Sequence, residues 1–179
     1  MTYSSLFTHD LLEAFLLSLP LIIGGTIHMI VVKKDILSYF KRPIHQRWFG
    51  KNKTWRGVIV MPLSTWFGVW LTNLVSYRFE NISLLYMGLI LGFAYLLAEL
   101  PNSFVKRKLG IKEGKLPDSK RWLFAFFDQA DSAIGCMIAY RFLMGTTWTV
   151  LLLTLVVGTI IHLVMNVLLY FLGIRENAL

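Results

Sequence analysis

The sequence has a single cysteine, Cys136, and only 10 acidic residues against 18 basic ones. One cysteine cannot form an intramolecular disulfide or a cluster of thiolate metal ligands. The N-terminal residues 1–10 lack the basic region of a signal peptide, and the apolar run after them is too long for one, so we expect a retained membrane span. Internal repeats and low-complexity tracts are also lacking, which predicts one domain over residues 1–179.

Charged residues of both signs are scarce. They make up 16% of the chain, and the mean hydropathy of +0.60 is too high for a soluble domain. A helix needs about 20 mostly apolar residues to cross the bilayer core. Five stretches satisfy this and predict an all-α membrane protein with about five transmembrane helices, at residues 11–32, 58–77, 82–100, 122–144 and 148–174.

The basic residues are concentrated between these stretches. The loops at about 33–57 and 101–121 hold all of the Lys and Arg residues except Arg78, Arg141 and Arg175. Because positively charged loops stay in the cytoplasm, we expect the N-terminus outside and both loops and the C-terminus inside. The predicted localisation is the cell (inner) membrane, multi-pass, with the active site facing the cytoplasm.

Two carboxylates interrupt the fourth stretch. Asp128 and Asp131 are three residues apart, so they project from one face of a helix. An ionised carboxylate within a span costs about 3 kcal/mol on insertion scales, so a cation is expected beside the pair. Mg²⁺ suits such oxygen ligands, and Glu99 is a candidate third ligand. The alternative is a structural ion pair with Lys120, Arg121 or a base of the first loop.

The first basic loop closes with residues 49–57, which are rich in charged and hydroxyl donors. Lys51, Lys53, Thr54 and Arg56 make this a phosphate-binding composition, although the spacing is not that of a P-loop. A polybasic segment that only holds anionic headgroups explains the same composition equally well.

The second loop and the fourth stretch carry an ordered motif. It consists of Ser103, Lys106-Arg107, Lys112-Glu113, Pro117 and then Asp128-x-x-Asp131. This order resembles the signature of the CTP-dependent phosphatidate cytidylyltransferases. The short chain, the Lys53-Thr-Trp-Arg-Gly57 run and the Asp-Gln-x-Asp run look more like the CDP-archaeol synthase branch. The resemblance covers residues 49–57 and 99–135.

The resemblance implies roles for individual residues. It implies that Asp128 and Asp131 hold the Mg²⁺ used with CTP, and that Lys106, Arg107 and Lys112 contact phosphates. The predicted sets are catalytic Asp128, Asp131, Lys106 and Arg107; substrate-binding Lys51, Lys53, Thr54, Arg56, Asn102, Ser103 and Lys112; and metal-binding Asp128, Asp131 and Glu99. Two positions depart from the pattern, because Ala98-Glu99 replaces an expected Gly-Asp and Glu113 replaces an aspartate.

The predicted reaction is attack of a lipid phosphate monoester on the α-phosphorus of CTP, which releases pyrophosphate and leaves a CDP-activated lipid for phospholipid biosynthesis. The expected partners are CTP, the lipid phosphate and the bilayer, with no nucleic acid. An archaeol-type ether lipid phosphate is what the resemblance implies. Phosphatidic acid stays open as the acceptor, because both lipids present the same headgroup.

Two other functions would also place aspartates in a membrane helix. A CDP-alcohol phosphotransferase needs further aspartates after the first pair, yet no acid follows Asp131 before Glu176, which excludes it. A small membrane transporter or assembly factor using the aspartates as an ion site is the remaining alternative. An ion pathway should continue across the bilayer, but the first, second and fifth stretches hold no carboxylate beyond Glu13.

Overall fold

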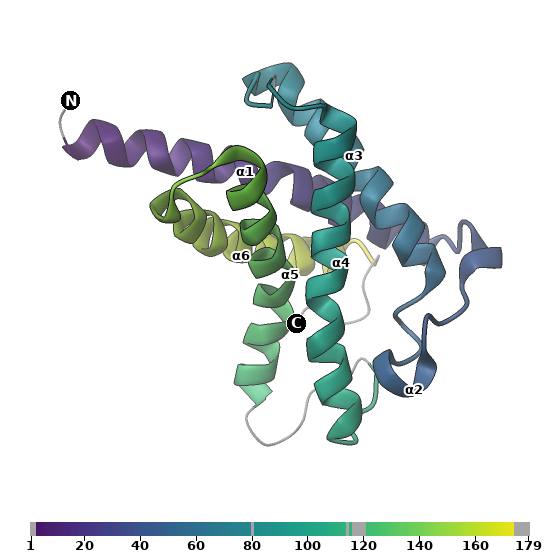
Figure 1. Cartoon of the computed structure of the whole chain (residues 1–179). Helices are drawn as coiled ribbons and strands as arrows, with labels where there is room; N and C mark the ends of the chain where they lie inside the picture. The colour runs from purple at the N-terminus through teal and green to yellow at the C-terminus, as the bar shows by residue number, and fades with distance from the viewer. Residues whose placement is uncertain (1–2, 80, 114, 116–120, 174–179) are drawn as a thin grey trace.

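The computed structural model describes residues 3–79, 81–113, 115 and 121–173, and it confirms an all-α membrane protein (Figure 1). In chain order the helices are α1 (Tyr3–Lys33), the short 3₁₀ helix η1 (Ser38–Phe40), α2 (Gln46–Phe49), α3 (Trp55–Ser76), α4 (Leu84–Lys108), α5 (Arg121–Met144) and α6 (Trp148–Phe171). The five long helices correspond to the five predicted stretches.

Four of the long helices, α1, α3, α4 and α6, are apolar enough over a sufficient length to cross a membrane. Helix α5 has 24 residues and begins within one residue of the predicted fourth stretch, but it is not in this group among the described residues. Helix α5 carries the charged residues Asp128, Asp131 and Arg141. The orientation of the chain in the bilayer stays a prediction.

Helix α4 lies at the centre of the arrangement that forms the site. It packs against α3 and α5, while α1 packs against α3 and α6. Helix α4 also continues through Pro101 to Lys108, so the first part of the second basic loop is helical. In Figure 1 the lower end of α4 stands between α2 and the beginning of α5.

Two glycines allow α4 to approach α3 closely. A Cβ atom on Gly88 would lie 2.2 Å from the Cα of Trp66, and one on Gly92 would lie 2.3 Å from the Cα of Pro62. Gly88 and Gly92 are four residues apart and therefore share one helix face, the small-residue spacing by which membrane helices pack backbone against backbone. This contact sets the position of α4.

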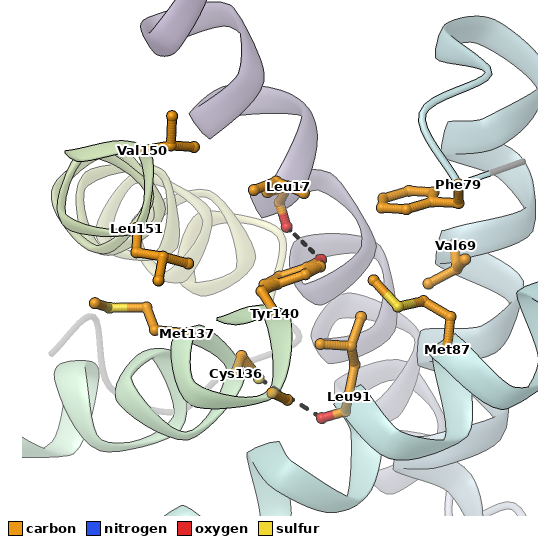
Figure 2. Close-up of a cluster of buried hydrophobic side chains, with 11 residues drawn as sticks. Leu17, Val69, Phe79, Met87, Leu91, Cys136, Met137, Tyr140, Val150 and Leu151 are labelled. Atoms are coloured by element: carbon orange, nitrogen blue, oxygen red, sulfur yellow. Dashed lines mark hydrogen bonds between the residues drawn. The ribbon is translucent and has the colours of Figure 1, made fainter. Parts of the chain in front are cut away.

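Buried side chains connect α5 to its neighbours (Figure 2). The hydroxyl of Tyr140 donates a hydrogen bond of 2.8 Å to the Leu17 carbonyl of α1. The Cys136 thiol lies 3.6 Å from the Leu91 carbonyl of α4 and donates to it. Both side chains are fully buried, so these polar atoms need partners where no water reaches them. The two bonds help to fix α5 beside α4.

Backbone hydrogen bonds close the first basic loop. The Ile44 amide donates to the Lys53 carbonyl at 2.8 Å, and the Trp55 amide donates to the Arg42 carbonyl at 3.0 Å. These bonds pair residues 42–44 antiparallel with residues 53–55, and α2 lies between the two segments. The pairing holds Lys51 and Lys53 next to the extension of α4.

The close contact between α3 and α4 makes a prediction. Gly92→Ala forces a methyl group into the backbone of α3, so we expect it to lower the free energy of unfolding by about 1–3 kcal/mol. Thermal unfolding of the purified protein in detergent measures this loss. Gly25→Ala in α1 is the matched control, because nothing lies within 4 Å of a Cβ at Gly25. Equal melting temperatures for the two variants would contradict the close contact between α3 and α4 at Gly92.

Candidate active site

The two aspartates of α5 face the extension of α4. The Asn102 side-chain amide donates to Asp128 Oδ1 at 2.7 Å and to Asp131 Oδ2 at 2.9 Å. The backbone amide of Ser132 also donates to Asp131 Oδ1 at 2.6 Å. Both carboxylates therefore point at one nitrogen atom, which shows that they converge on a single position between α4 and α5.

Lys106 neutralises part of this charge. It lies four residues after Asn102, on the same face of α4, and its ammonium group forms an ion pair with Asp128. Only 9% of the Lys106 side chain is exposed. The structural ion pair that is the alternative to a metal is therefore present, but its base comes from α4. Lys120 and the side chain of Arg121 lie outside the described residues.

Lys53 places the first basic loop beside the same group of carboxylates. Its ammonium group forms an ion pair with Glu99, and both side chains are mostly buried. Burial by itself would lower the pKa of Lys53, but the negative charge of Glu99, reinforced by Asp131 and Asp128, raises it above the ordinary value. Lys53 is therefore held in its charged form beside all three carboxylates.

The oxygen atoms present fit a divalent cation only in part. Two carboxylates that converge on one position match the one or two that Mg²⁺ usually takes from a protein, with water and substrate phosphates completing its octahedron. Glu99 does not close a three-acid cluster with them, since no group of three His, Cys, Asp or Glu side chains suited to a metal occurs among the described residues. Glu99 contacts Lys53 instead, and its role as a metal ligand stays a prediction.

Glu113 links the two basic loops on another side of α4. Its Oε2 atom lies 3.7 Å from Arg107 Nη1, and its Oε1 atom accepts a hydrogen bond of 3.1 Å from the Lys51 amide of the first loop. Backbone hydrogen bonds, from its own amide and that of Lys51, lower the pKa of Glu113. Gly50 is needed here, because its φ is +85° and a Cβ would lie 2.7 Å from Glu113 Cγ. Two buried nitrogens of Arg107, Nε and Nη1, have no hydrogen-bond partner among the described residues.

A polar hollow of about 410 Å³ opens between α2 and α4. We call it the basic hollow, and it is lined by Arg47, Trp48, Phe104, Arg107 and Lys108. The rings of Trp48 and Phe104 meet edge to face, with their centroids 6.1 Å apart. The sequence pattern did not predict this hollow, although the spacing of Phe104, Arg107 and Lys108 places all three side by side on a helix.

Thr54 and Arg56, which were also predicted to bind substrate, contact residues other than the aspartates. Thr54 caps α3 by accepting a hydrogen bond from the Gly57 amide at 3.3 Å. The side chain of Arg56 is buried and donates to Asp35 at 2.8 Å, which anchors the beginning of the first loop. Their observed contacts are structural.

Ser103 and Lys112 have a different status. Ser103 lies on α4 and is half-buried, and Lys112 is exposed in the segment after α4. Within the described part of the chain neither side chain has a hydrogen bond or an ion pair that would assign it a structural role.

Comparisons with known proteins identify the family of the chain. The family model "CarS-like: CDP-archaeol synthase" matches residues 11–178. The chain is 30% identical to the CDP-archaeol synthase of Methanoculleus marisnigri over 147 residues, which are 73% of this chain and 81% of that protein. It is 29% identical to the CDP-archaeol synthase of Staphylothermus marinus over 137 residues, 72% of this chain and 70% of that protein.

No solved structure matches the chain. The family match, however, spans nearly the whole length and includes both basic loops and the aspartate pair. The chain therefore belongs to the CDP-archaeol synthase family, whose members transfer a cytidylyl group from CTP to a lipid phosphate.

Proposed function

We propose that this chain makes a CDP-activated ether lipid from CTP and an archaeol-type lipid phosphate, with Mg²⁺ bound at Asp128 and Asp131. The observation that carries the proposal is the convergence of these two carboxylates on one position beside Asn102. The printed names of both relatives support the archaeol-type acceptor. The clustering of the basic residues supports a site that faces the cytoplasm of the inner membrane.

In this reaction the protein itself takes little part in making or breaking bonds. A phosphate oxygen of the lipid attacks the α-phosphorus of CTP, and the bond from that phosphorus to the bridging oxygen of the β-phosphate breaks. Pyrophosphate leaves with the bonding electrons. In reactions of this kind the rate comes from positioning the reactants and from neutralising charge on the phosphate oxygens.

The bases of α4 and of the first loop supply that neutralisation in the proposal. Lys106 and Lys53 are buried next to the carboxylates, so their charges act in a region from which most water is excluded. Lys112, Lys51 and Ser103 remain proposed phosphate contacts of CTP. Arg107, the fourth predicted contact, lies on another side of α4 beside Glu113, and its role toward CTP stays a prediction. When bound, Mg²⁺ supplies further positive charge for the phosphate oxygens.

Asn102 has a positioning role in this proposal. Its amide donates to both aspartates, which holds the two like charges at one place before the nucleotide arrives. Thr54 and Arg56 contribute by holding the first loop in position, Thr54 as the cap of α3 and Arg56 through Asp35.

The charge of Asp131 is the first feature to test. Asp131→Asn keeps the shape of the side chain but removes the negative charge, so we expect turnover of labelled CTP into lipid to fall at least 100-fold, the upper end of what outer-shell changes at metal sites cost (roughly 10- to 100-fold). Membrane insertion should be retained. Asp10→Asn is the matched control, because Asp10 lies toward the N-terminal end of α1, and we expect it to have normal turnover. Wild-type turnover in Asp131→Asn would refute the assignment.

A substitution of Lys106 distinguishes a role in binding CTP from a purely structural role. If its ammonium contacts a CTP phosphate, Lys106→Ala loses a charge-assisted hydrogen bond of about 1.5–3 kcal/mol, and the KM for CTP should rise roughly ten- to hundredfold. Steady-state kinetics in detergent measure the change, with the exposed Lys33→Ala as control. A lower melting temperature with an unchanged KM would assign Lys106 to the ion pair with Asp128 alone.

The acceptor is tested by competition. The purified enzyme is given labelled CTP with equal amounts of an archaeol-type phosphate and phosphatidic acid, and the two products are separated. We expect CDP-archaeol to predominate by at least tenfold. Equal products, or an excess of CDP-diacylglycerol, would overturn the ether-lipid acceptor while leaving cytidylyl transfer intact. Absence of pyrophosphate release with either lipid would argue instead for the transporter.

A further inference from the structure

The basic hollow lies on the face of α4 that is turned away from the aspartates. Successive residues of a helix are rotated by about 100°, so Phe104 and Lys108 point roughly opposite to Asn102 and Lys106. The contacts agree, because Asn102 and Lys106 bond to α5 whereas Phe104 meets Trp48 of α2. Figure 1 likewise shows α4 between α2 and α5. The hollow is therefore separate from the carboxylate site.

The charge of the hollow is largely uncompensated. Neither Arg47 nor Lys108 has an ion pair with any acid in the part of the chain that the structure describes. Arg107 has Glu113 at 3.7 Å, but two of its buried nitrogens still have no hydrogen-bond partner there. Three cationic side chains with one nearby acid would repel one another, so the site favours an anion with several acceptor oxygens.

The walls of the hollow suit a ligand at a membrane surface. The Lys108 ammonium lies 5.5 Å from the centre of the Phe104 ring, and half of the Trp48 side-chain surface is exposed. The adjacent apolar residues Val105 and Leu109 of α4 are 48% and 61% exposed. Tryptophan with basic residues beside exposed apolar side chains is the combination found at headgroup depth.

We propose that the basic hollow binds the phosphate of an anionic membrane lipid, at a second lipid site separate from the reaction. Arg47 and Lys108 bind the phosphate oxygens at the rim and Arg107 binds them from the inner wall. Trp48 and Phe104 lie along the upper part of the acyl or isoprenoid chains. The lipid would hold α2, and with it the loop that carries Lys51 and Lys53, against α4.

Native mass spectrometry of the full chain in detergent tests this site without using activity. The protein is titrated with phosphatidylglycerol and, separately, with the zwitterionic phosphatidylcholine. Arg47→Gln/Lys108→Gln should weaken phosphatidylglycerol binding at least tenfold, since each base near an anionic headgroup contributes about 1 kcal/mol. The control, Lys33→Gln/Lys34→Gln, removes two exposed bases near the same interface but outside the hollow and should change binding less than twofold.

Three results would overturn the proposal. They are equal weakening in both double variants, equal binding of phosphatidylcholine and phosphatidylglycerol, and displacement of the lipid by pyrophosphate or CTP, which would make the hollow a site for soluble phosphates. Circular dichroism checks the fold of each variant. Lys108→Gln alone, at the exposed end of α4, provides a milder change that should still weaken binding several-fold.

Discussion

The rest of this structure depends on the cost of placing two carboxylates in an otherwise apolar helix. Helix α4 compensates Asp128 and Asp131 through the amide of Asn102 and the ammonium of Lys106. This compensation requires α4 to remain helical past Pro101 and to lie directly beside α5. The membrane part of the fold supplies that position, through the glycine contact with α3 and the buried Tyr140 and Cys136 bonds of α5.

Different parts of the first basic loop contact opposite sides of helix α4. Lys53 approaches α4 on the face that carries Glu99, whereas α2 covers the face that carries Phe104. One loop thus contributes to two places of different chemistry. Beside the carboxylates its charge balances the protein's own acids, and in the basic hollow the charge is left for a ligand. The first loop was interpreted either as a segment that only attracts headgroups or as a segment that binds substrate. The two interpretations are compatible, because they apply to different residues of the loop.

The local sequence predicted most of the helical architecture and the family of the chain. Apolar stretches of sufficient length specify membrane helices because the bilayer leaves the backbone few other ways to satisfy its hydrogen bonds. The spacing of Asp128 and Asp131 predicted that both side chains project from one face of a helix. The ordered motif around Lys106 and Arg107 indicated the family that the comparisons show. These inferences needed only neighbours along the chain.

Pairing between distant residues was decided by the tertiary structure alone. Asn102 was expected to bind substrate and lies between the aspartates, Arg56 is held by Asp35, and Glu99 is paired with Lys53 across 46 residues of sequence. A charge in a sequence does not specify its partner, because electrostatic energy depends on distance and burial in three dimensions. The sequence by itself determined which residues are costly in a membrane, and only the packing of α4 against α2, α3 and α5 determined what compensates them.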